Sequence, residues 1–412
     1  MEFKNQYFQF PTKLKNLSII LMAIGVLATI GGYIYYNSLM HHGAEGHHAT
    51  NQVWSNLLVN SFYFMGVSLA ALFFLIIQYI AKAGWAIGVR RIQEAITAFL
   101  PVGAVLMFIV FLAGAFHQHH IYHWMAEGIT DPLSENYDEV IDGKSGYLNV
   151  PFFLLRAVVY FGVWVFIRNW FRKASLREDE AGYTVKGYRQ EVRMAAIFTV
   201  FYAVTSSTSA WDWLMSIDTH WFSTMYGWYV FAGTFVSSFI VTIIIILYLH
   251  SEDLATHINE NHLHDLAKFM FAFSVFWTYV WFSQFMLIWY ANIPEEVTYF
   301  QDRFSNYKAL FFINLLINFI LPFFTLIMRA AKRNHFILGI VCAIIFFGHW
   351  LDVFLIVTPG VMKADWHFGI VEIGMFVGFT GLFSYVVLNS LSKASLAPKN
   401  NPYFIESITH HI

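Results

Sequence analysis

The feature that most constrains the fold is a series of long apolar runs, each close to the length that crosses a lipid bilayer. The hydrocarbon core of a bilayer needs about 20 mostly apolar residues per helix. The runs are continuous and do not alternate, which favours membrane helices over a β-barrel. The sequence therefore predicts an all-α polytopic membrane protein with ten transmembrane helices. We place them at residues 16–36, 56–80, 95–116, 149–171, 190–212, 225–249, 267–290, 307–329, 335–358 and 368–391.

Charged residues are too scarce for a soluble protein. Asp, Glu, Lys and Arg make up 12% of the chain and apolar residues 58%, whereas a typical soluble domain carries about 25% charged residues. A chain with so few charges cannot cover a water-exposed surface of this size. A net charge near −2 gives no basis for an anionic partner. This composition excludes a soluble globular protein, a disordered chain and a nucleic-acid-binding protein.

The distribution of basic residues predicts the orientation, because cytoplasmic segments carry an excess of Lys and Arg. Of the 24 Lys and Arg residues, 19 lie in or beside the two tails and the loops on their side of the membrane. The opposite side holds only Lys144, Arg303, Lys308 and Lys363. We therefore expect both termini in the cytoplasm. Residues 1–392 form one membrane domain in this interpretation, and residues 393–412 form a short polar tail.

The sequence offers no ligands for a redox cofactor. Its single cysteine, Cys342, lies inside an apolar run. One cysteine cannot form an intrachain disulfide, hold an iron–sulfur cluster or complete a Cys-x-x-Cys-His haem attachment. A b-type haem needs two deep histidines that face each other, and only His349 lies deep in a predicted span. We expect no cofactor on this chain and predict no catalytic, cofactor-binding or metal-binding residue.

A few ionisable residues lie inside predicted spans, where charge is costly and indicates function by default. Four of them lie on four spans at similar depth, near the non-cytoplasmic surface: Arg156, Asp212, Asp352 and Glu372. His349 lies nearer mid-membrane, on the same helix face as Asp352. One interpretation is a proton path, since carboxylates and histidine take up and release protons. A second is that Arg156 neutralises one carboxylate and the rest bond to neighbours, and a third is a direct ligand site.

A run of hydroxyl side chains leads to Asp212 in the predicted fifth span. Hydroxyls both donate and accept hydrogen bonds, so the run would support a water chain as part of the proton path. Alternatively, each hydroxyl bonds to its own helix backbone. The residues of this hypothesis are Ser206, Ser207, Thr208 and Ser209, preceded by Thr205.

Histidines gather between the predicted third and fourth spans, in the order His117, His119, His120 and His123. The spacing of four between His119 and His123 is one that a helix presents to zinc. No cysteine lies nearby to complete a metal site. The pattern therefore fits interfacial loop histidines, with a metal or partner contact as the alternative.

The segment at residues 211–227, WDWLMSIDTHWFSTMYG, carries a family resemblance. So does the predicted ninth span, in which Asp352 precedes Pro359 at the helix end. With ten spans and cytoplasmic termini, the chain resembles the polysulfide-reductase-like (NrfD-type) membrane subunits of bacterial alternative complex III, in particular the second of its two such subunits. The resemblance covers essentially the whole chain.

The resemblance implies a fold of two four-helix bundles, from spans 2–5 and 6–9, with spans 1 and 10 outside. It implies a complex in the bacterial cytoplasmic (inner) membrane that oxidises quinol, usually menaquinol, and passes electrons to cytochrome c or directly to a terminal oxidase. The implied partners are a sister NrfD-type subunit, an iron–sulfur subunit, and multihaem and monohaem c-type cytochromes. Haem c would reside on the cytochromes, and the iron–sulfur clusters on the iron–sulfur subunit. The sister subunit is usually assigned the quinol site. We also expect bound lipids.

The leading hypothesis is a cofactor-free, non-redox membrane subunit that scaffolds its partners and provides a proton path coupled to quinol oxidation. One alternative is a quinol-binding electron-transfer subunit in its own right, with His349 and Asp352 as an acid–base pair. Another is a secondary transporter. Such folds use inverted repeats in which Gly or Pro breaks paired helices at corresponding positions. The sequence shows no such repeat, and Pro101 and Pro322 do not form such a pair.

Overall fold

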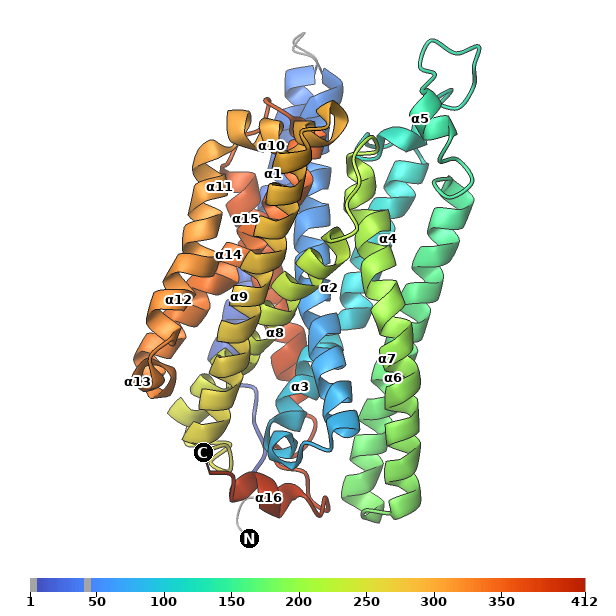
Figure 1. Cartoon of the computed structure of the whole chain (residues 1–412). Helices are drawn as coiled ribbons and strands as arrows, with labels where there is room; N and C mark the ends of the chain where they lie inside the picture. The colour runs from blue at the N-terminus through green and yellow to red at the C-terminus, as the bar shows by residue number, and fades with distance from the viewer. Residues whose placement is uncertain (1–5, 41–45, 412) are drawn as a thin grey trace.

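The computed structural model describes residues 6–40 and 46–411. Within these residues the chain is α-helical, and its long helices run side by side as one bundle (Figure 1). Nine helical segments of the described chain are long and apolar enough to cross a membrane. The protein is therefore a multi-pass membrane protein, as the sequence predicts.

The long helices are α1 (Thr12–Met40), α2 (Gly46–Ala81), α4 (Leu100–Ala115), α6 (Val150–Ala181), α7 (Val185–Trp213), α8 (Tyr226–Ser251), α9 (Glu260–Ala291), α14 (His335–Met362) and α15 (Ile370–Leu391). The shorter helical segments are η2 (Gly84–Val89), α3 (Arg90–Ile96), η3 (Thr97–Phe99), η4 (His123–Met125), α5 (Glu139–Asp142), η5 (Met215–Ile217), α10 (Pro294–Asn306), α11 (Lys308–Leu315), the π-helix η6 (Leu316–Ile320), α12 (Leu321–Leu326), α13 (Arg329–Arg333) and α16 (Phe404–Ile408).

The nine apolar segments match nine of the predicted spans. The predicted fifth span, 190–212, is helical too, as part of α7. Charged side chains in the first three turns of α7 make it less apolar than the others: Lys186, Arg189, Glu191 and Arg193.

The predicted start of the third span is wrong. The helical segment begins at Gly84 and not at residue 95, so Arg90 and Arg91 lie inside it and not in a loop. Both side chains are buried, at 3% and 2% exposed. They are tolerated there because Glu94, one turn further along the helix, pairs with both of them.

Helices α2, α8 and α14 form the interior, with 72–83% of their most apolar stretches buried. Only 17% of the corresponding stretch of α1 is buried, so α1 lies at the outside of the bundle. It packs against α15 through small residues, which let helix backbones approach closely in a membrane. A Cβ added at Gly25 would lie 2.5 Å from the Cα of Gly378, and one added at Gly374 would lie 2.3 Å from the Ala28 side chain.

Both termini lie at one end of the bundle, and the C-terminal tail is packed against that end (Figure 1). The tail bonds to the N-terminal segment where the Leu396 amide donates to the Gln6 carbonyl at 2.9 Å. The Ser407 hydroxyl donates to the Trp85 carbonyl at 2.7 Å, and His410 Nε2 lies 2.7 Å from Asp265 Oδ2 on α9. The tail therefore connects elements that are distant in sequence.

The contact between α1 and α15 predicts a position-dependent effect of valine on α1. Gly25→Val would place side-chain atoms against the Gly378 backbone, and we expect it to lower the free energy of unfolding by about 1–3 kcal/mol. Thermal unfolding in detergent measures this. Gly31→Val is the matched control, since no atom lies within 4 Å of its added Cβ. Equal effects of the two substitutions would contradict close packing at Gly25.

Candidate functional site

Arg156 of α6 and Asp212 of α7 form a buried ion pair. The Arg156 Nε donates to Asp212 Oδ2 at 2.7 Å and its Nη2 donates to Oδ1 at 3.0 Å. The two side chains are 7% and 0% exposed. The third guanidinium nitrogen donates to the Tyr147 carbonyl at 3.0 Å, and the guanidinium lies over the Tyr147 ring at 3.9 Å. A bidentate pair with this geometry satisfies both charges and joins the two helices.

The hydroxyl run beside this pair bonds mainly to its own helix. The Thr208 hydroxyl donates to the Val204 carbonyl at 3.1 Å, and Ser209 donates to the Ser206 carbonyl at 3.2 Å. Ser206 makes a long contact of 3.5 Å with the Ala203 carbonyl. Ser207 packs against Gly227. A Cβ added at Gly227 would lie 2.8 Å from the Ser207 side chain. This arrangement favours helix contacts over a water chain.

Asp352 of α14 is held by three neutral donors from three other helices. Tyr229 of α8 and Asn314 of α11 donate to its Oδ1, the latter at 2.8 Å. The Trp277 indole of α9 donates to Oδ2 at 3.0 Å. Asp352 is 3% exposed, and no described Lys or Arg forms an ion pair with it. In contrast to Asp212, this carboxyl group therefore lacks a directly bonded cation.

His349 lies one turn before Asp352 on α14 and is 1% exposed. Its ring meets the Trp277 ring edge-on, with centroids 5.6 Å apart. Neither ring nitrogen has a hydrogen-bond partner among the described residues. Trp277 thus contacts both ionisable groups, which brings His349 and Asp352 into one cluster.

Two asparagines extend the Asp352 cluster, and sequence reasoning missed them. The Asn318 amide donates to Asn314 Oδ1 at 2.6 Å, and Asn318 is fully buried. Asn318 lies in the π-helix η6. Because a π-helical turn holds one residue more than an α-helical turn, it changes which side of the helix the following residues face. Two asparagines four residues apart in an apolar span were the available signal, because such groups need partners in lipid.

A small cavity of about 20 Å³ borders Asp352, which is room for about one water molecule. Gln284 and Arg303 also line it. Arg303 donates to the Leu355 and Ile356 carbonyls and lies 3.7 Å from Asp218. Burial raises the pKa of Asp218, and the nearby Arg303 opposes this shift. A line of ionisable groups therefore leads from Asp352 toward the loop after α7.

Glu372 forms a third cluster, at the start of α15. Its Oε2 accepts from the Gly369 amide at 2.7 Å, and its Oε1 accepts from the side chains of Gln52 and Asn56 at 2.7 and 2.8 Å. The helix N-terminus also favours negative charge. The partners come from α2, whose next polar residue, Asn60, accepts from the Trp350 indole at 2.9 Å. Sequence reasoning missed these residues of α2, although a spacing of four was visible.

The structure therefore brings Arg156 and Asp212 together and places Asp352 with His349, while Glu372 is separate. Among the described residues, no side-chain hydrogen bond joins one of these three clusters to another. Equal depth in the membrane did not imply contact, because depth carries no information about the angle around the bundle.

A fourth cluster, near the termini, was also missed. The Glu94 carboxylate pairs with Arg90 at 3.2 Å and with Arg91 at 2.9 Å, and it contacts Arg172 of α6 as well. Arg91 also pairs with Asp179, whose Oδ1 accepts from the Lys399 amide of the tail at 3.0 Å. The cluster therefore ties α3, α6 and the tail together.

The histidines after α4 do not converge on a metal site. Within the described residues, no group of three or more His, Cys, Asp or Glu side chains could hold a metal ion. His119 is 4% exposed, and its Nε2 donates to the Val110 carbonyl at 2.9 Å. Burial lowers the pKa of His119 to about 4. It is a neutral core residue that fixes the loop to α4.

No family model matches the chain, and no curated protein matches it. The fold and the clusters define it as a multi-pass, all-helical membrane protein with buried ionisable groups.

The ion pair of α6 and α7 predicts a non-additive pair of substitutions. Arg156→Gln or Asp212→Asn alone leaves one buried charge without its partner, and we expect each to cost about 3–5 kcal/mol of stability. The double variant removes both charges and should lose less than the sum. Thermal unfolding of all four proteins in detergent measures this. Additive losses would show that the two side chains act independently.

The environment of His119 predicts an acid-sensitive stability. Its folded pKa is about 4 against 6.5 for the free side chain, so the unfolded chain binds more protons between these values. Stability should fall as pH is lowered from 6.5 to 4, by up to about 3 kcal/mol. His119→Gln should flatten this decline, since its amide donates to Val110 but does not titrate. His123→Gln, an exposed neighbour, should leave the decline unchanged; parallel curves for all three proteins would refute this.

Proposed function

We propose that the chain is a cofactor-free, non-redox membrane subunit of a quinol-oxidising respiratory complex, of the NrfD type found in alternative complex III. It would scaffold its partners and provide a proton path coupled to quinol oxidation. The specific support is the tryptophan-rich segment at 211–227, together with the buried aspartate ahead of Pro359.

The proposed topology has ten spans. Helix α7 is counted as a span with the nine more apolar segments, since its 29 residues are long enough to cross a bilayer. Two four-helix bundles then comprise the segments from α2 to α7 and from α8 to α14, with α1 and α15 outside. The packing of α1 on α15 supports this arrangement. Both termini lie at one end of the bundle (Figure 1), and the excess of basic residues there supports a cytoplasmic location in a bacterial inner membrane.

The Asp352 cluster is the observation that carries the proton-path proposal. A carboxyl group deep in a membrane protein needs a strong structural reason or a function. Arg156 supplies the structural reason for Asp212. Asp352 has only neutral donors, so either protonation state can be accommodated without breaking an ion pair. Such a group suits uptake and release of a proton better than one locked in a bidentate pair.

The neighbours of Asp352 suggest which groups would exchange a proton with it. On one side lies His349, whose two ring nitrogens lack hydrogen-bond partners among the described residues. On the other side lies the small cavity that leads to Arg303 and Asp218. We propose that a proton moves between these sides through Asp352, with one water in the cavity. In this scheme, Arg156, Asp212, Glu372 and the hydroxyls Ser206, Ser207, Thr208 and Ser209 support the helices and do not carry the proton.

The size of the cavity disfavours the alternative in which this chain binds quinol at Asp352. Ligand pockets for small molecules are typically about 300–1,000 Å³, and this cavity is about 20 Å³. We therefore propose that menaquinol binds to the sister subunit. Haem c and iron–sulfur clusters would lie on the cytochrome and iron–sulfur subunits.

Purification of the tagged chain from native membranes in mild detergent tests the assignment. Mass spectrometry and a haem spectrum should reveal c-type cytochromes and an iron–sulfur subunit in stoichiometric amounts. A lone chain without haem would contradict a complex subunit, and solute uptake by the chain in liposomes would then support a transporter.

The proton path predicts that Asp352→Asn uncouples proton movement from electron transfer. In proteoliposomes that contain the assembled complex, the number of protons moved per electron should fall, because an amide cannot take up the proton. Quinol oxidation in the presence of an uncoupler should stay within about twofold of the wild type. Asp365→Asn is the matched control, since it removes an exposed carboxylate just after α14. An unchanged proton-to-electron ratio in Asp352→Asn would leave only the scaffolding role.

A further inference from the structure

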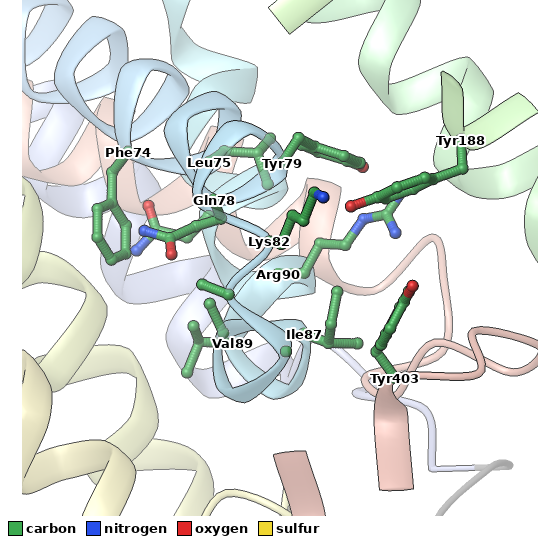
Figure 2. Close-up of a pocket in the computed structure, with 14 residues that line it drawn as sticks. Phe74, Leu75, Gln78, Tyr79, Lys82, Ile87, Val89, Arg90, Tyr188 and Tyr403 are labelled. Atoms are coloured by element: carbon green, nitrogen blue, oxygen red, sulfur yellow. The ribbon is translucent and has the colours of Figure 1, made fainter. Parts of the chain in front are cut away.

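A pocket lies near the termini, where α2 ends at Ala81 and the next helical segment begins at Gly84. Tyr188 of α7 and Tyr403 of the tail also line it (Figure 2). Two apolar helical segments end here, as membrane helices do at the level of the lipid headgroups. Tyrosines are typical of this level, since their rings are amphipathic.

Arg90, which lines this pocket, carries a buried hydrogen-bond donor without a partner in residues 6–40 and 46–411. Its side chain is 3% exposed, with Nε bonded to Glu94 at 3.2 Å and Nη1 bonded to Glu178 at 2.9 Å. Its Nη2 is buried and has no hydrogen-bond partner among the described residues. A buried donor on a charged group is costly when it is left unpaired. An oxygen of a bound anion would satisfy it.

A second buried group is unsatisfied in the same pocket. The Gln93 side chain is 1% exposed and its amide nitrogen donates to Thr242 at 2.7 Å. Its Oε1 has no partner within the described part of the chain. Two residues that line one pocket thus each carry a polar atom left unpaired by the described chain, which favours a polar ligand.

Lys82 adds a second positive charge. Figure 2 shows the Lys82 and Arg90 side chains among the residues that line the pocket, together with Tyr79 and Tyr188. Lys82 is exposed and has a φ of 51°, a left-handed conformation that glycine adopts more easily. Lys82 therefore adds an exposed ammonium to the residues that line the pocket, which favours an anionic ligand.

The remaining lining is mainly apolar and includes Phe74, Leu75, Ile87 and Val89. The cavity is about 40 Å³, which exceeds the room that one water needs but cannot hold an acyl chain. A ligand that is anionic, small at its head and attached to apolar groups matches this combination.

We propose that this pocket binds the phosphate group of an anionic membrane lipid, with Arg90 and Lys82 as its cationic contacts. The acyl chains extend into the surrounding bilayer. The lipid bridges the end of α2, α7 and the tail, and so it stabilises the end of the bundle that carries the fourth cluster. This role is independent of proton transfer at Asp352.

Glu191 of α7 gives the proposal a second, opposite test. It lines the adjoining cavity and interacts electrostatically with Arg90, but it does not line the lipid pocket. Its negative charge competes with a bound phosphate for Arg90. Neutralising Glu191 therefore strengthens lipid binding, whereas neutralising Lys82 weakens it.

The experiment measures the thermal unfolding of the delipidated full chain in detergent as lipid is added. Phosphatidylglycerol should raise the midpoint more than phosphatidylcholine does. The half-saturating phosphatidylglycerol concentration should rise at least threefold in Lys82→Gln and fall in Glu191→Gln. Lys173→Gln removes an exposed charge at the same end, outside the pocket, and should leave the concentration unchanged. These variants avoid Arg90, whose ion pairs also support the fold.

Three results would overturn the proposal. Equal stabilisation by phosphatidylcholine would show that binding does not depend on the net charge of the headgroup. Equal stabilisation by inorganic phosphate alone would assign the pocket to a free anion. A response to phosphatidylglycerol that is the same in Lys82→Gln and Lys173→Gln would place the lipid elsewhere on the protein.

Discussion

Ionisable side chains that enter the apolar interior of this protein need hydrogen-bond partners, and those of Asp212, Asp352 and Glu372 include side chains from other helices. Lipid is as apolar as leucine, so apolar contact alone gives membrane helices little reason to choose one neighbour over another. Buried polar groups favour particular neighbours, because a buried polar group without a hydrogen-bond partner is costly. Arg156 and Asp212 join α6 to α7, Glu372 joins α15 to α2, and Asp352 joins α14 to α8, α9 and α11. The helix arrangement follows these contacts.

The same requirement is met in two different ways, and the difference separates structure from function. Asp212 is neutralised by a bidentate arginine, and moving a proton onto it would break that pair. Asp352 is satisfied by the neutral donors Tyr229, Asn314 and Trp277. Neutral partners tolerate a change of charge better than an ion pair does. This distinction is the basis on which we propose scaffolding for the first pair and proton transfer for the second cluster.

The sequence alone predicts the helices well, because apolar length is a direct property of the chain. Nine of the ten predicted spans correspond to apolar helical segments, and the remaining one, the predicted fifth span, lies within α7. The start of the third span was missed because Arg90 and Arg91 were treated as solvated loop residues. Glu94 of the same helix compensates their charge, and only its spacing of three and four residues indicated this.

The candidate site was only partly predictable. Depth in the membrane identified Arg156 and Asp212, which meet, and Asp352 and Glu372, which do not meet them. Contacts across the bundle depend on the rotation of each helix, which apolar runs do not encode. Trp277 illustrates this, since nothing in the sequence distinguished this donor to Asp352 from an ordinary interior tryptophan.

The central claim is that Asp352 changes its protonation state during turnover. Infrared difference spectroscopy of the purified complex, recorded between its oxidised and quinol-reduced forms, measures this directly. The account predicts a carboxylic-acid band that shifts in heavy water, is lost in Asp352→Asn and persists in Asp365→Asn. A difference spectrum in which this band is unchanged by Asp352→Asn would show that the proton moves elsewhere.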